Sequence, residues 1–120
     1  MKKRNKKVAN YLEYIPSRNE KYRWETDEEG AVTIFVENKG VLMRITQKLI
    51  NKPKVSQIHL EEMGSFIWPL IDGQRNILEI GVLVKEHFGD AAEPLYERLV
   101  QYLHSLEVND FIRVKAVKTE

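Results

Sequence analysis

The chain has 120 residues, of which 42% are hydrophobic and 31% charged, an ordinary mixture for one globular domain. It contains no cysteine, which excludes disulfide bonds, a thiolate nucleophile and cysteine-ligated zinc or iron–sulfur sites. The net charge of +1 gives no support to a nucleic acid or an anionic membrane as the main partner. No apolar run approaches the ~18 residues of a membrane-spanning helix, and we expect a cytoplasmic protein.

The positive charge is concentrated at the N-terminus. Residues 1–10 hold five basic and no acidic side chains, which leaves 14 basic against 18 acidic residues over 11–120. The residues that follow lack the apolar stretch of a signal peptide. We therefore expect a basic, flexible lead-in over residues 1–19 and a folded domain over residues 20–117. The lead-in is expected either to be solvated or to bind an acidic partner.

Alternating polar and apolar residues predict strands in the first half of the chain. Residues 22–26 and 32–36 form a hairpin pattern around a turn at 27–30, and residues 14–16 are expected to be extended because a proline follows Ile15. Residues 41–50 are ambiguous, although their apolar spacing suits a short amphipathic helix. Residues 55–60 are short and partly β-branched, and they predict a third strand.

The second half of the chain predicts three helices and a final strand. The first begins at Glu61 and is expected to kink or end early near Trp68, because Pro69 cannot continue a regular helix; Trp68 itself is expected to anchor the core. The second begins at an Asn76–Glu79 capping pair and ends at Gly89. The third covers 91–108 and is capped either by Asp90 or by Glu93 with a proline after it. Residues 111–117 alternate like a strand.

This order of elements predicts an α+β fold. Three consecutive helices beside a small antiparallel sheet are typical of a winged helix-turn-helix-like domain. Such a plan often binds DNA through its third helix. Here that helix carries Glu93, Glu97 and Glu107 against Arg98 alone, and a polyanion would be repelled. A winged-helix DNA-binding regulator therefore stays an alternative, and nucleic acid is not the expected partner.

The motifs of catalysis are missing from the sequence. His59, His87 and His104 lie on different predicted elements, and none belongs to an HExxH pair. There is no glycine-rich phosphate loop, and no serine lies in a G-x-S-x-G setting. We expect a protein that is not an enzyme and that binds neither a metal nor a cofactor.

One stretch resembles a known family. Residues 60–73 (LEEMGSFIWPLIDG) are similar to the hallmark of the PqqD family, the pyrroloquinoline-quinone biosynthesis protein D: a glycine, an aliphatic–Trp pair, then Asp-Gly. The likeness continues through residues 75–80, through residues 87–89 and along the leucine-rich third helix. It covers about residues 55–113, and Pro69 departs from the family pattern.

The resemblance implies a peptide-binding module. Such proteins hold the leader segment of a ribosomally made precursor peptide and present it to a modifying enzyme, commonly a radical SAM protein. The leader adds as a strand to the edge of the sheet and packs beside the third helix. The expected contacts are Val55, Ser56, Gln57, Ile58 and His59 from the strand and Tyr96, Arg98, Leu99 and Tyr102 from the helix.

Two other partners remain open at this point. The domain could be an interaction adaptor that binds a protein without any leader peptide. An exposed edge strand can also pair with a second copy of itself, which would give a homodimer.

Overall fold

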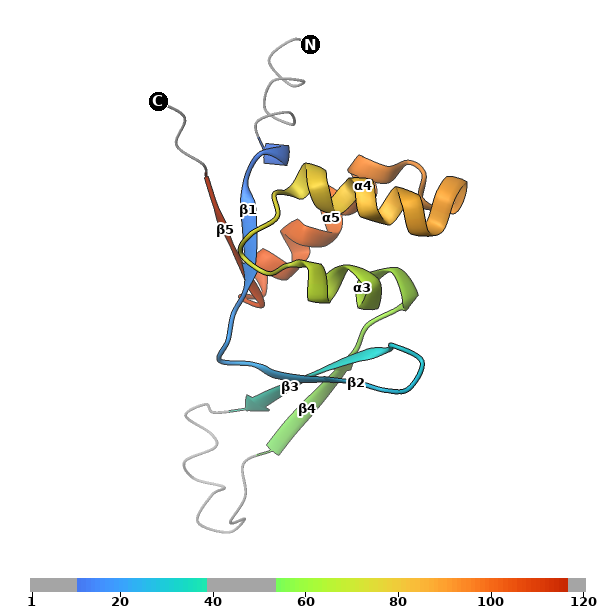
Figure 1. Ribbon diagram of the computed structural model, residues 1–120. Helices are drawn as coiled ribbons and strands as arrows, with labels where there is room; N and C mark the ends of the chain where they lie inside the picture. Colours follow the sequence, from blue (N-terminus) through green and yellow to red (C-terminus); the bar gives the residue numbers. More distant parts are fainter. Residues whose placement is uncertain (1–10, 39–53, 117–120) are drawn as a thin grey trace.

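The computed structural model describes residues 11–38 and 54–116. The prediction of an α+β fold is confirmed, and the order of elements is consistent with the winged-helix plan (Figure 1). The ambiguous segment 41–50 and the basic residues 1–10 lie outside the described residues. In chain order the elements are β1 (Ile15–Arg18), β2 (Arg23–Thr26), β3 (Val32–Asn38), β4 (Lys54–His59), α3 (Glu62–Ile67), η1 (Trp68–Leu70), α4 (Ile77–Phe88), η2 (Gly89–Ala92), α5 (Leu95–Val108) and β5 (Ile112–Lys115).

The predicted hairpin and the third strand form one antiparallel sheet in the order β2-β3-β4. The Asp27 carboxylate closes the hairpin turn by accepting the N–H groups of Glu29 and Ala31, both at 2.9 Å. Gly30 ends the turn with a φ of +87°, which only glycine adopts readily. β4 pairs with β3 along its whole length and lies at the end of the sheet.

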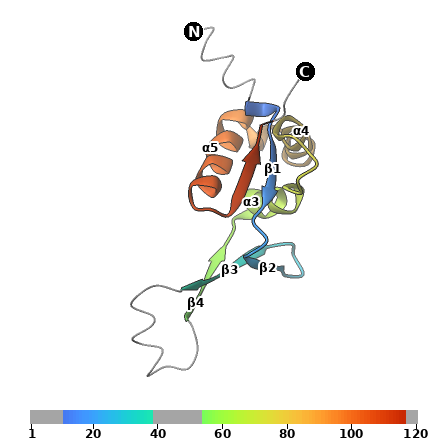
Figure 2. The ribbon, with the colours of Figure 1, turned by 90° about the vertical axis from the view of Figure 1, so that its left-hand side faces the viewer.

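The antiparallel strands form two sheets, because β1 and β5 pair with each other apart from β2, β3 and β4. Ile15 pairs with Lys115 and Arg18 with Ile112, so a strand within the expected lead-in 1–19 is tied to the end of the domain. Pro16 obscured this strand in the sequence, because proline lacks a ladder donor and is tolerated only at sheet edges. Figure 2 shows β1 and β5 side by side, above the three-stranded sheet and between α4 and α5.

The core lies between the helices and the inner face of the three-stranded sheet. Trp68 is fully buried, as predicted, and the ring of Trp24 from β2 meets it edge-on, with the two centroids 6.2 Å apart. Val32 and Ile34 of β3 are buried against the helices. The sheet is therefore held to the helices through its central strand, and β4 is left at the rim.

The helix ends follow the sequence signals closely. The regular helix α3 ends at Ile67, and Pro69 lies in the short η1, so the early end near Trp68 is confirmed. Asn76 and Glu79 form the predicted capping box at the start of α4. At α5 neither predicted residue is the N-cap, because Pro94 occupies that position and the helix begins at Leu95. The Glu93 carboxylate, one residue earlier, still accepts the N–H of Leu95 at 3.1 Å.

Candidate functional site

The outer side of β4 carries backbone groups that no described strand meets. Leu60 N–H donates to Val32 C=O at 2.9 Å, so these two residues form a hydrogen-bonded pair of the β3–β4 ladder. Such pairs alternate along an antiparallel ladder, which places Ile58 in the next one. The N–H and C=O groups of Val55, Gln57 and His59 therefore point away from β3, to the open side of the sheet.

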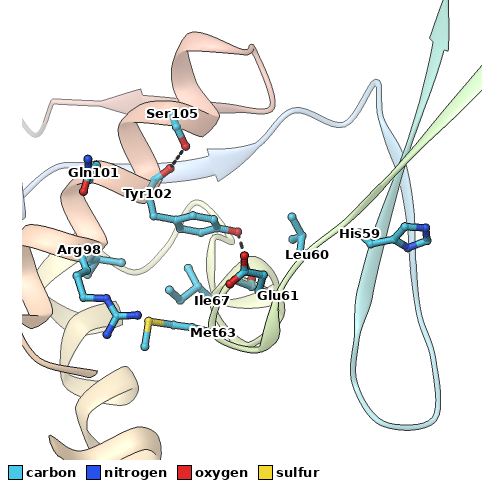
Figure 3. A pocket seen from close by; sticks show the side chains of 11 residues that line it. His59, Leu60, Glu61, Met63, Ile67, Arg98, Gln101, Tyr102 and Ser105 are labelled. Carbon is cyan, nitrogen blue, oxygen red and sulfur yellow. Dashed lines mark hydrogen bonds between the residues drawn. The ribbon is translucent and has the colours of Figure 1, made fainter. Parts of the chain in front are cut away.

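A pocket of about 460 Å³ adjoins the end of this strand. It lies between α3 and α5 and reaches β4 at His59 (Figure 3). Ile67 and Leu99, which are only 1% and 2% exposed, contribute core side chains to its wall. The pocket is lined by His59, Leu60, Glu61, Met63, Gly64, Ile67, Arg98, Leu99, Gln101, Tyr102 and Ser105.

Ser65 fixes α3 against the sheet beside this pocket. Its buried hydroxyl accepts the N–H of Val32 at 2.8 Å and donates to the carbonyl of Leu60 at 3.1 Å. One side chain thus joins α3 to β3 and to the end of β4. The position of the pocket relative to the open strand is therefore set by a buried hydrogen-bond bridge.

Tyr102 extends from α5 across to α3. Its phenol donates to the carbonyl of Gly64 at 3.3 Å, and Figure 3 shows the ring pointing at α3 with Leu60 and His59 beyond the hydroxyl. Burial raises the pKa of Tyr102, so the phenol stays neutral and keeps its proton for this bond. A Cβ atom on residue 64 would lie 2.8 Å from the Tyr102 hydroxyl. Glycine at this position therefore allows the close approach.

The rim of the pocket is polar. Arg98 is exposed, and its Nη1 donates to the carbonyl of Ala91 at 2.9 Å, which fixes the guanidinium near the pocket. Glu61 is exposed on the same rim. The His59 ring meets the Thr33 hydroxyl at 3.0 Å on the outer face of the sheet. An apolar interior with a mixed rim suits the side chain of an extended peptide.

The structure gathers only part of the predicted contact set. His59, Arg98, Leu99 and Tyr102 line the pocket together. Ile58 is half-buried against the core, and its backbone faces β3, as does that of Ser56. Gln57 lies on β4 with its backbone toward the open side.

Tyr96 and Val55 lie elsewhere. Tyr96 packs against Gly81 of α4 and does not line the pocket. Val55 is 44% exposed and lines a second hollow of about 450 Å³ beside β2 and β3. The helix surface next to Tyr96 therefore belongs to the α4–α5 contact.

The sequence prediction missed much of the pocket wall. Met63 and Ile67 have the apolar spacing of a helix face that packs on the core, and both also contact the core in the structure. Gln101 and Ser105 follow Arg98 at i+3 and i+7, which is the spacing of one helix face. That spacing could have found them; nothing in the sequence signals the role of Leu60 and Glu61, because they become neighbours of α5 only through the fold.

Two other features are absent from the part of the chain that the structure describes: a metal-binding cluster and a membrane-spanning helix. No cluster of three or more His, Asp or Glu residues that could hold a metal ion occurs in residues 11–38 and 54–116. Within the same ranges, every helix is too short or too polar to cross a membrane.

Comparison with known proteins gives one match. The family model described as coenzyme PQQ synthesis protein D (PqqD) matches residues 44–112, more than half of the chain. No curated protein matches the chain. No solved structure matches it. The matched range includes β4, α3, α4, α5 and the start of β5, whereas β1, β2 and β3 lie before it.

Proposed function

The chain belongs to the PqqD family, and on that premise we propose that it binds the leader segment of a ribosomally made precursor peptide by strand addition to β4. Family membership supports an accessory protein of the PQQ-biosynthesis type. In the proposed role the chain performs no chemistry itself. It presents the bound peptide to a modifying enzyme of the radical SAM class.

The observation that carries this proposal is the position of the pocket beside the open strand. An added strand would accept and donate hydrogen bonds at Val55, Gln57 and His59, whose backbone groups point outward. Side chains of the added strand alternate between the two faces of the sheet, and those on the helix side would lie next to Leu60 and the pocket. Backbone pairing then supplies affinity, and the pocket supplies selectivity.

Arg98 adds an electrostatic element to the proposed site. Its exposed guanidinium lies at the pocket rim and holds one hydrogen bond to Ala91, so further donors remain for a ligand. A carboxylate on the bound peptide would form a charge-assisted hydrogen bond there. We therefore expect peptides with an acidic residue next to an apolar one to bind best.

The test replaces one outward donor of β4. Gln57→Pro removes the N–H that an added strand would use, while the ladder to β3 keeps its own donors. The matched control is Thr26→Pro, because the N–H of Thr26 points to the open side of β2, at the other end of the same sheet. Both variants carry the same substitution on an outer edge.

The probe is a set of peptides selected from a random display library against the immobilised full chain. We expect calorimetry to show that Gln57→Pro weakens their binding by about tenfold or more, whereas Thr26→Pro leaves it unchanged. Circular dichroism confirms that both variants are folded. Equal binding by wild type and Gln57→Pro would show that strand addition does not occur at β4.

A further inference from the structure

We propose that Gly64 and Tyr102 act as a pair that sets the size of the peptide side chain accepted by the pocket. This inference rests on the proposed function, since it concerns the same site. Gly64 and Tyr102 would determine the size selectivity of the pocket, and substitutions at the two positions would shift that selectivity in opposite directions.

The pair meets inside the pocket, at the point where α3 and α5 approach. The Tyr102 ring fills the space between the two helices, and its hydroxyl is bonded to the Gly64 carbonyl. Both residues line the cavity, so a change in either alters its volume directly. Figure 3 shows no other labelled aromatic ring between the two helices.

Gly64 allows the ring to lie as deep as it does. A Cβ on residue 64 would come within 2.8 Å of the Tyr102 hydroxyl and 3.2 Å of its ring carbon Cζ. These separations are below van der Waals contact, and the residue belongs to a buried helix turn that cannot move aside easily. Alanine at this position would push the ring outward, into the volume that a ligand side chain occupies.

The opposite change enlarges the cavity. Tyr102→Leu removes the ring and its hydroxyl while keeping an apolar side chain with good helix propensity. The vacated space lies next to Met63 and Ile67, which are apolar, so a larger ligand side chain could fill it. Tyr102→Phe is the matched control, because it removes only the hydroxyl and keeps the ring.

The experiment uses one of the selected peptides that lose affinity for Gln57→Pro. Alanine substitution along this peptide identifies its anchor, the apolar residue whose loss weakens binding most. Versions with valine, leucine, phenylalanine and tryptophan at the anchor are then titrated against wild type, Tyr102→Phe, Tyr102→Leu and Gly64→Ala. Each variant is checked for folding by thermal unfolding.

The inference predicts opposite shifts. Tyr102→Leu should favour the larger anchors over valine by about tenfold relative to wild type, and Gly64→Ala should favour valine by a similar factor. Tyr102→Phe should keep the wild-type order. If Gly64→Ala does not fold, the double variant Gly64→Ala/Tyr102→Leu replaces it, and its preference should return toward that of wild type.

An unchanged order of anchors in Tyr102→Leu would overturn the inference, even if that variant were less stable. This failure is distinct from failure of the proposed function. In the first case binding still depends on Gln57, and only the size preference stays constant. In the second case binding does not respond to Gln57→Pro at all.

Discussion

Gly81 of α4 lies directly under the ring of Tyr96 from α5. A Cβ at residue 81 would overlap Cε1 of that ring. We expect Gly81→Ala to lower the free energy of unfolding by up to about 2 kcal/mol, because overpacking costs about 1–3 kcal/mol and the gain in helix propensity of about 1 kcal/mol offsets only part of it. Chemical denaturation measures the change. Val82→Ala on the same helix is the control, since Val82 is half exposed and should cost little.

Tyr96 provides the internal check on this contact. Tyr96→Leu removes the ring atoms that a methyl group on residue 81 would meet, so the double variant should regain part of the loss. If the effects of Gly81→Ala and Tyr96→Leu simply add, the two residues do not interact, and the destabilisation must come from another cause. The same contact explains why Tyr96 packs between α4 and α5 and does not line the pocket, although it is an aromatic residue on the third helix.

Asp72 shows how a single carboxylate organises the loop after η1. Partial burial opposes its ionisation, but the N–H groups of Gln74 and Arg75 and the Arg75 guanidinium outweigh burial and lower the pKa of Asp72 below 3.8. Arg75 Nη1 lies 2.7 Å from the carboxylate. The ionised form is therefore the one that stabilises the folded loop.

This shift predicts the pH dependence of Asp72→Asn. A group whose pKa is lower in the folded state contributes stability above its unfolded pKa and loses it as the pH falls through the folded value. We expect wild type to be more stable than Asp72→Asn at neutral pH, by less than about 1 kcal/mol because the ion pair is partly exposed. Urea denaturation should show the difference disappear as the pH falls below about 4. A constant difference down to about pH 2 would contradict it.

At the scale of elements, α4 is defined by its capping box. Asn76 Oδ1 accepts the N–H of Glu79, and the Glu79 carboxylate accepts the N–H of Asn76, both at 2.8 Å. We expect Asn76→Ala to lower the free energy of unfolding by about 1 kcal/mol, since the N–H of Glu79 at the helix start loses its acceptor. Glu86→Ala, on the exposed face of the same helix, is the control and should have little effect.

The β3–β4 ladder is the other element that governs the site. The backbone N–H and C=O groups of the six residues of β4 alternate between its two sides. The register with β3 determines which residues direct these groups outward. A shift of one residue would turn Ile58 away from the core and expose it. The buried Ile34, which lies opposite Ile58, therefore stabilises the register in which the backbone N–H and C=O of Gln57 are available to a ligand.

At the scale of the whole molecule, Arg18 joins the two sheets through the helices. From β1 its Nη1 donates to the carbonyls of Trp68, Pro69 and Ile71 at 3.0–3.2 Å. Its guanidinium also lies 5.1 Å from the centre of the Trp24 ring on β2. One side chain thus contacts η1, the residue that follows it and the three-stranded sheet.

We expect Arg18→Ala to lower the free energy of unfolding by about 2 kcal/mol, because several carbonyls lose a charged donor at once. Tryptophan fluorescence is the natural probe, since Trp24 and Trp68 are the only tryptophans in the sequence and both adjoin Arg18. Arg113→Ala on β5 is the control, as that side chain is exposed. Equal effects of the two substitutions would show that Arg18 has no special role.

The sequence by itself determined the elements whose signals are local. The hairpin around Gly30, the early end of the first helix before Pro69 and the Asn76–Glu79 cap each depend on neighbouring residues, so short-range chemistry is enough to predict them. The family resemblance over 60–73 depends on the same kind of local pattern, and the family match includes that stretch.

Only the tertiary structure decided the rest. β1 forms because β5, nearly a hundred residues away, supplies its partner; its four residues carry no alternating pattern, only the extended preference before Pro16. The tyrosines at 96 and 102 are alike in sequence, yet one packs on Gly81 and the other on Gly64 in the pocket. The direction in which each backbone group of β4 points depends on its register with β3. Such contacts join distant parts of the chain, and their geometry exists only once the core has packed.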